Sequence, residues 1–207
     1  MSPVRTISPA PSELHVGDYV VRRYKTSDAP ELVRAVTESL SHLSPWMPWA
    51  KFEPQSVEQR EELIRSWSAE WDTGTDFTMG IFLGERVVGG TGLHLRGAEN
   101  TVDIGYWVHV DFVGKGIATM VSQLLTEMAF AIWPEIDIVE IHHDEANIAT
   151  GKVPLHLGFQ HVRTVERIPE APSESGVLYH WAMARNRYLF SGADDDGTVV
   201  AAKTKVV

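Results

Sequence analysis

The sequence predicts a single α+β domain, in which a mixed, mostly antiparallel twisted sheet is flanked by helices. One observation is a run of three alternating segments between residues 77 and 110, separated by tight turns, which is typical of an antiparallel meander. Another is a change of period after residue 116, where apolar residues recur at helical spacing up to about Trp133 and a β-branched segment follows at residues 136–143. Strand, helix and strand then form one crossover unit, which we expect to be right-handed.

The first part of the chain predicts one strand and two helices. Residues 16–24 alternate weakly and are interpreted as the first strand. Asp28 is expected to cap the first helix, which residues 44–49 interrupt with two prolines. Ser56, with Gln59 three residues later, marks the start of the second helix.

The last part of the chain predicts a short helix and a strand pair. Pro134 closes the long helix of the crossover. A short helix is expected over residues 150–157, and the glycine that follows it directly marks its end. Residues 159–167 and 177–184 are expected to form two paired strands across a proline-rich loop.

Composition limits the classes of function. The formal charge of −10 argues against nucleic-acid binding, which rests on clustered Lys and Arg; it either provides solubility alone or favours a cationic acceptor such as an amine. The absence of cysteine excludes disulfides and thiolate chemistry. No apolar run approaches the roughly 20 residues of a membrane span, and we expect a cytoplasmic protein without a membrane partner. With 207 residues, we expect one domain over residues 1–187 and a flexible tail over residues 188–207.

A glycine-containing turn joins the last strand of the meander to the long helix. It comprises Gly114, Lys115, Gly116, Ile117, Ala118 and Thr119. Glycines allow positive φ and a close approach of the backbone to a ligand, and the amides at a helix start attract anions. The turn therefore predicts a site for a pyrophosphate, although an ordinary strand-to-helix turn has the same composition.

Two other phosphate-binding motifs do not fit this turn. A P-loop requires glycine where His109 stands and Ser or Thr where Gly116 stands. A dinucleotide fingerprint requires Gly or Ala at Thr119 and a parallel sheet before it, whereas an antiparallel meander is expected here.

Several segments around the turn resemble the GNAT superfamily of N-acyltransferases, and more narrowly the branch that includes the ribosomal-protein N-terminal acetyltransferases. The resemblance covers residues 16–184. It is carried by the sequence DIGYWV at residues 103–108 before the glycine turn, by NIAT at residues 147–150 followed by LGF at residues 157–159, and by the tryptophan-bearing LSPWMPW at residues 43–49.

The resemblance implies that the fourth and fifth strands splay apart and admit acetyl-CoA, or a longer acyl-CoA, as cosubstrate. The backbone of Val108 and Val110 would pair with the pantetheine arm, and Asn147 would lie near the thioester. The amides of the glycine turn would bind the pyrophosphate, while Lys152 would reach the phosphates of CoA. The acceptor would be a primary amine of a protein N-terminus or a small molecule, and a homodimer is expected.

Acetyl transfer to an amine needs a base, an oxyanion donor and a group that assists the leaving thiolate. The family's usual tyrosine acid falls at Pro154, so Thr150 is either its replacement or only a helix cap. The N–H of Val108 is the candidate oxyanion donor. Asp103 is either the base or a solvated strand residue, and Asn147 completes the candidate catalytic set.

The acceptor site is expected near the tryptophan segment. Trp46 and Trp49 either line an acceptor pocket or pack in the core. One of His142 and His143 points inward, and His143 is the candidate acceptor contact. No metal site is expected, because adjacent strand residues face opposite sides of a sheet and no third ligand is evident. The alternatives to an enzyme acting on protein N-termini are an antibiotic- or metabolite-modifying acetyltransferase and a non-catalytic CoA-binding sensor.

Overall fold

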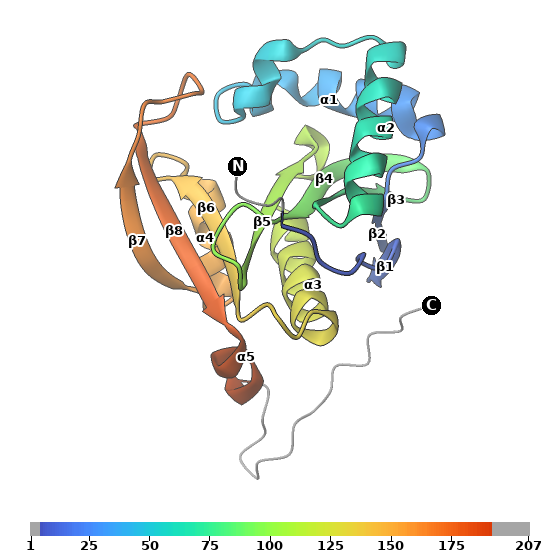
Figure 1. Cartoon of the computed structure of the whole chain (residues 1–207). Helices are drawn as coiled ribbons and strands as arrows, with labels where there is room; N and C mark the ends of the chain where they lie inside the picture. The colour runs from blue at the N-terminus through green and yellow to red at the C-terminus, as the bar shows by residue number, and fades with distance from the viewer. Residues whose placement is uncertain (1–4, 192–207) are drawn as a thin grey trace.

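The computed structural model describes residues 5–191, which form one eight-stranded mixed sheet with helices on both faces (Figure 1). The strand order is β1-β2-β3-β4-β5-β6-β8-β7. The strands are β1 Glu13–Val16, β2 Tyr19–Arg23, β3 Asp76–Leu83, β4 Arg86–His94, β5 Thr101–Val108, β6 Ile138–Asp144, β7 Gln160–Glu166 and β8 Val177–Ala184. The helices are α1 Ala29–Leu43, α2 Val57–Thr73, α3 Ile117–Ile132, α4 Ile148–His156 and α5 Arg185–Ser191. Within the described residues, no helix combines the length and apolarity that a membrane crossing requires.

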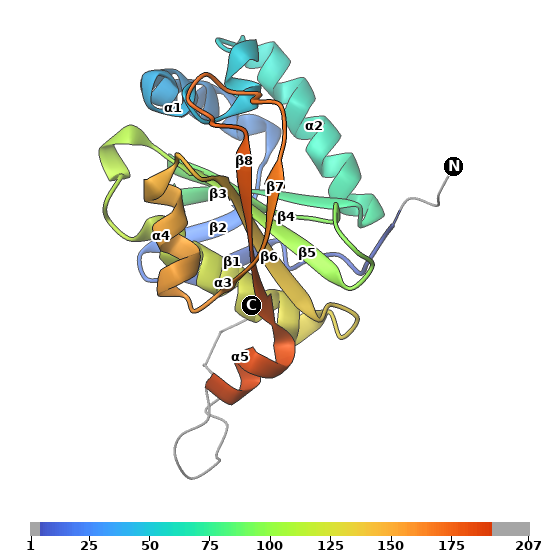
Figure 2. The same cartoon turned by 90° about the vertical axis from the view of Figure 1, so that its left-hand side faces the viewer.

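The expected meander and crossover are confirmed. β3, β4 and β5 pair antiparallel in sequence order, and α3 connects β5 to the parallel strand β6. The expected final pair also forms, with β8 inserted between β6 and β7. Figure 2 shows α1 and α2 together at the top, with α3 and α4 below them across the sheet.

Two hydrophobic clusters hold the layers together. The larger one joins α3 to the sheet and contains Phe77, Leu125 and Trp133, all fully buried. The smaller one joins α1 and α2 to the opposite face through Leu32, Ile64 and other buried side chains.

The N-terminal region differs from its prediction in two places. Residues 16–24 do not form one strand, because Gly17 adopts a left-handed φ of 57° and turns β1 back onto β2. Asp28 occupies the N-cap position of α1, but its carboxylate does not cap that helix. It instead accepts two hydrogen bonds from Arg22, at 2.7 and 2.9 Å. The second helix starts as predicted, with a reciprocal capping box between Ser56 and Gln59.

The C-terminal prediction also needs a correction. The last strand continues directly into α5, Arg185–Ser191, so residues 188–191 are helical rather than part of a tail. The Arg185 guanidinium donates to the carbonyl oxygens of Phe130, Trp133 and Ile136, which attaches the start of α5 to the end of α3. Residues 192–207 of the expected tail lie outside the described residues.

Candidate functional site

The site begins at a gap between β5 and β6, the fourth and fifth strands of the expected count. The two strands pair only from Thr101 to Asp103 on β5 and then part. The N–H of His109 donates to the carbonyl of Val88 on the β4 side, at 2.9 Å. Because successive main-chain groups point alternately to the two sides of a strand, those of Tyr106 and Val108 point into the gap.

Val110 does not extend this edge. β5 ends at Val108, and Val110 opens a short 3-10 helix, Val110–Phe112. Its N–H donates to the hydroxyl of Ser39 in α1, at 3.2 Å. The Val110 N–H is therefore already bonded within the protein, and the main-chain groups of β5 that face the gap are those of Tyr106 and Val108.

The glycine turn has the geometry of an anion site. Gly114 and Gly116 both adopt left-handed φ values, of 78° and 77°, and no described atom lies within 4 Å of a Cβ built at either position. Gly116 is the N-cap of α3, and no described side chain caps the helix there. Its first amides are therefore left for solvent or an anion. Lys115 is exposed, with its Nζ 4.4 Å from the centre of the Phe112 ring.

The residues after Gly116 contribute differently. The side chain of Ile117 is buried in the core, so only its amide can reach a ligand. Ala118 and Thr119 are half-buried in the first turn of α3. Lys152 is exposed on α4, the helix that packs against α3.

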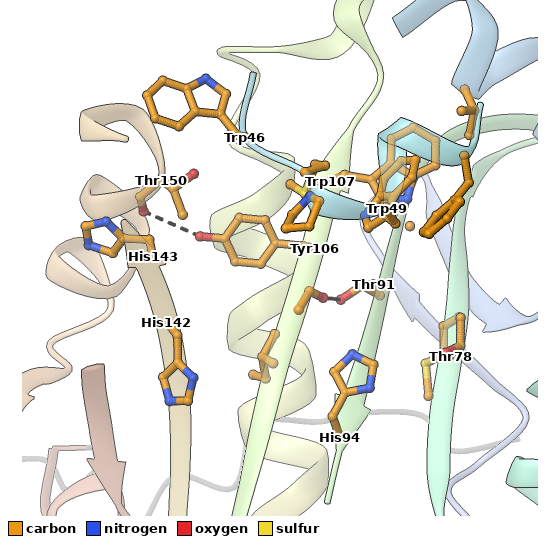
Figure 3. A pocket seen from close by; sticks show the side chains of 18 of the residues that line it. Trp46, Trp49, Thr78, Thr91, His94, Tyr106, Trp107, His142, His143 and Thr150 are labelled. Carbon is orange, nitrogen blue, oxygen red and sulfur yellow. Dashed lines mark hydrogen bonds between the residues drawn. The ribbon is translucent and has the colours of Figure 1, made fainter. Parts of the chain in front are cut away.

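The start of α4 forms the opposite wall of the gap. Asn147 is the N-cap, and its Oδ1 accepts the N–H of Thr150 at 3.2 Å. The alternative that Thr150 caps this helix is therefore wrong. Pro154 lies inside α4 and has no N–H, so it leaves the carbonyl of Thr150 without its helical partner. The hydroxyl of Tyr106 donates to that carbonyl at 3.4 Å and joins β5 to α4 (Figure 3).

A cavity of about 690 Å³ lies beside the gap and reaches residues on both faces of β5. Gly105 of β5, which carries no side chain, lines the cavity, and its cross-strand neighbour Gly92 on β4 leaves room for the His94 ring. Trp46 and Trp49 both line the cavity and are half-buried, and the Trp49 ring packs edge-to-face on Trp107 at 6.4 Å (Figure 3). The volume is in the range of small-molecule and substrate sites.

A buried ion pair supports the tryptophan segment from below. Arg60 of α2 and Glu53 are 4% and 3% exposed, with 2.5 Å between Arg60 Nη2 and Glu53 Oε1. Both residues line the cavity, as does Gln55. Arg60 Nε and Gln55 Oε1 have no hydrogen-bond partner among the described residues. Because an unpaired buried polar atom is costly, the cavity wall is suited to a ligand with hydrogen-bonding groups.

An imidazole that the sequence analysis missed lines the cavity, and a carboxylate behind it holds the ring. His94 Nδ1 is 2.7 and 2.9 Å from the two carboxylate oxygens of Asp76 on β3. The two residues are cross-strand partners, and His94 lines the cavity. The sequence contains a weak signal for this contact, because Asp76 and His94 lie at the open end of the predicted hairpin, where its two strands face each other. Their pairing nevertheless depends on a β-bulge between Ile81 and Phe82, which shifts the register by one residue.

Further titratable groups continue this row across the sheet. Asp103 is the cross-strand partner of His94, and its Oδ1 is buried without a hydrogen-bond partner among the described residues. Burial raises the pKa of the Asp103 carboxyl. Asp103 does not itself border the cavity. His142 Nε2 lies 3.9 Å from Asp103 Oδ1 and 2.6 Å from Glu140 Oε2.

Three of these groups could also approach a metal ion. Glu140, His142 and His180 bring ligand atoms within 4.8 Å of one another. In the structure these atoms bind protein groups instead: the hydrogen bond from His142 lowers the pKa of Glu140, and Arg163 lies 3.0 Å from His180 Nδ1. A guanidinium at a ligand nitrogen opposes a cation there.

His143 points to the opposite face of the sheet from His142. Its Nδ1 donates to the carbonyl of Asp144 at 2.8 Å, and its Nε2 accepts from the Trp181 indole at 2.9 Å. Burial lowers the pKa of the His143 imidazole. Although His143 borders the cavity, both ring nitrogens have protein partners, which favours a structural role beneath Gly151 of α4 over the expected contact with an acceptor.

Comparison with known proteins is consistent with this geometry. The family model described as "Acetyltransferase (GNAT) domain" matches residues 19–160. "Putative ribosomal N-acetyltransferase YdaF" of Bacillus subtilis (strain 168) is 26% identical over 140 residues, which are 67% of this chain and 76% of that protein.

Solved structures share the fold at lower identity. The ribosomal L7/L12 alpha-N-protein acetyltransferase RimL, in complex with coenzyme A, superposes with a TM-score of 0.75 at 18% identity, covering 84% of this chain and 99% of that one. The microcin C7 self-immunity acetyltransferase MccE, in complex with acetyl-CoA and AMP, gives a TM-score of 0.75 at 19% identity, covering 86% and 98%.

Proposed function

Because the chain belongs to the GNAT acetyltransferase family, and is therefore an acetyl-CoA-dependent acetyltransferase, we propose that its acceptor is the N-terminal amine of a protein or peptide. The observation that carries this proposal is the cavity, which borders Trp107 on one face of β5 and Tyr106 on the other. An acceptor in the cavity can therefore meet a donor in the gap. The names of YdaF and RimL, which refer to ribosomal proteins, favour a protein acceptor.

The residues present fit the cosubstrate, because α3 starts with uncapped amides beside two open left-handed glycines. We propose that the amides of Gly114, Lys115, Gly116, Ile117, Ala118 and Thr119 bind the pyrophosphate. Lys152 lies on the neighbouring helix and would contact a further phosphate. Asn147 and the main chain of Val108 would hold the pantetheine end, and acetyl-CoA supplies the thioester carbonyl that the amine attacks.

Three groups of the chain are suited to the reaction. The N–H of Val108 points into the gap and can donate to a developing oxyanion. The Thr150 hydroxyl, on the first turn of α4, can donate to the leaving sulfur. Asp103 contributes negative charge next to His94, although it acts through its neighbours because it does not border the cavity.

A small-molecule acceptor is the second candidate. Tryptophan rings suit a planar group, and the MccE structure contains AMP together with acetyl-CoA. Thiol release from acetyl-CoA should be measured with peptides that have free N-termini, the same peptides with blocked N-termini, and small aromatic amines. Turnover with free peptides alone supports the proposal, whereas turnover with small amines alone replaces it. CoA binding without turnover on any acceptor would identify a non-catalytic sensor.

A further inference from the structure

We propose that His94, oriented by Asp76, is the base that removes the proton from the acceptor amine. This inference rests on the proposed acetyl transfer and assigns a residue to its least defined step. An amine attacks a thioester only after it has lost its ammonium proton.

The contact with Asp76 fixes the tautomer of the imidazole. A carboxylate can only accept, so His94 Nδ1, which lies 2.7 and 2.9 Å from the two Asp76 oxygens, carries the hydrogen and donates it. In the neutral ring, Nε2 therefore keeps its lone pair. The Asp76 carboxylate is itself held by the Thr78 hydroxyl, which donates at 3.2 Å, and by Arg96 at 3.8 Å.

The His94 ring occupies a place that only glycines leave open. A Cβ at Gly92 would lie 3.0 Å from Cε1 of the ring, and one at Gly105 would lie 3.1 Å from Nε2. Both distances are shorter than ordinary contacts. Nε2 therefore lies over Gly105 of β5, and both residues line the cavity; Figure 3 shows the His94 ring.

The charges around His94 favour an ammonium acceptor. Carboxylates face it from three elements, Glu70 of α2, Asp76 of β3 and Asp103 of β5, and Arg96 is the guanidinium nearby. Negative charge draws the ammonium in and stabilises the imidazolium that forms when His94 accepts a proton.

The acceptor nitrogen gives its ammonium proton to His94 before it attacks. The N–H bond of the ammonium breaks, the proton moves to His94 Nε2, and the electron pair left on nitrogen forms the C–N bond to the thioester carbonyl. As the C–S bond breaks, the nitrogen loses its second proton and the leaving thiolate takes one up, so that CoA leaves as the thiol. The imidazolium then releases the proton to solvent through the open cavity. Asp76 is a positioning residue, since it orients the ring without touching the acceptor.

His142 is the competing base, because Glu140 holds it in a similar way. The centres of the His142 and His180 rings, however, are 3.9 Å apart, and Arg163 Nη2 lies 3.0 Å from His180 Nδ1. A proton on His142 would therefore be opposed by the Arg163 guanidinium across His180, whereas the carboxylates of Glu140 and Asp103 beside His142 are already shared with these cations. His94 is therefore the better candidate for the base, and substituting each histidine in turn distinguishes the two.

The test compares single variants of the full-length protein. His94→Asn keeps a donor for Asp76 but removes the base, and we expect turnover to fall by about 100-fold or more, the usual contribution of a general base, with CoA affinity unchanged. His15→Asn is the matched control, because the exposed side chain of His15 is paired with Glu13 on the edge strand β1. This control should retain full activity.

Two further readouts separate proton transfer from loss of structure. Added imidazole, or an acceptor amine that is already neutral at the assay pH, should restore part of the activity of His94→Asn. Asp76→Asn removes the carboxylate that orients the imidazole, so it should lower kcat, leave the affinity for CoA unchanged and respond to the same rescue by added imidazole.

If the wild-type protein is active and His94→Asn is equally active, the role of His94 is contradicted while the proposed acetyl transfer stands. The assignment of the base to His94 is also wrong if the rise of kcat with pH disappears in His142→Asn and remains in His94→Asn. Inactive wild-type protein with every acceptor would instead contradict the proposed function.

Discussion

The Tyr106 hydroxyl donates to the main-chain carbonyl of Thr150, 3.4 Å away, and this bond replaces one that α4 lacks. In a regular helix the N–H of residue 154 would bind that carbonyl, but residue 154 is proline. Pro154, at the position where the resemblance implied a tyrosine, therefore leaves a carbonyl free to accept from a tyrosine on β5. The bond fixes the two walls of the gap relative to each other.

Tyr106→Phe should destabilise the protein by about 1 kcal/mol, the usual worth of one hydrogen bond, and should lower turnover. In a Pro154→Ala background the helix can form its own bond to Thr150, so the same change should cost less. Urea unfolding of the four proteins in this double-mutant cycle measures the coupling. Equal costs in both backgrounds would show that the Tyr106 contact does not replace the helical bond.

Gly116→Val should weaken CoA binding, because valine disfavours the left-handed φ of 77° and its side chain projects into the anion site. Gly84→Val is the matched control: Gly84 has a φ of 59°, a similarly open surrounding and a place in the β3–β4 turn. Both variants should lose stability, by about 1–2 kcal/mol, and only Gly116→Val should lose CoA affinity in calorimetry. Unchanged affinity in Gly116→Val would make the turn merely structural.

Thr150→Ala should lower turnover more than CoA affinity if its hydroxyl assists the leaving thiolate. Loss of the hydroxyl should leave α4 intact, because Asn147 caps this helix. Thr150→Ser keeps the hydroxyl and should retain most of the activity. Steady-state kinetics decide the point, and a Thr150→Ala enzyme with wild-type turnover would remove Thr150 from the catalytic set.

Trp49→Ala should raise the KM for the acceptor and leave the affinity for CoA unchanged. Trp49 lines the cavity and packs on Trp107, whereas the glycine turn is on another part of the molecule. Trp49→Phe keeps an aromatic wall and should have a smaller effect. A rise in the Kd for CoA with no change in acceptor KM would contradict the assignment of the cavity to the acceptor.

The sequence predicted the elements whose signals are local. The capping box at Ser56 depends on residues three apart, and the amphipathic period of α3 depends on one helix face. The glycine turn was also predictable, because left-handed φ values at Gly114 and Gly116 follow from a strand-to-helix turn with glycines.

Features that depend on several elements at once were not predictable. Without the bulge at Ile81, Asp76 would pair with Leu93 and face away from His94. The hydrogen bond from Val110 to Ser39 depends on how α1 packs against the end of β5. The same holds for Tyr106, whose partner is set by a proline 48 positions later in a different element.

A donor in the β5–β6 gap and an amine in the cavity lined by Trp46 and Trp49 are expected to meet at β5. Mass spectrometry of a peptide incubated with the protein and acetyl-CoA tests it most directly. We expect one acetyl group on the N-terminal amine of a free peptide and none on a peptide with a blocked N-terminus. If CoA binds and no amine in the panel gains an acetyl group, the claim is contradicted.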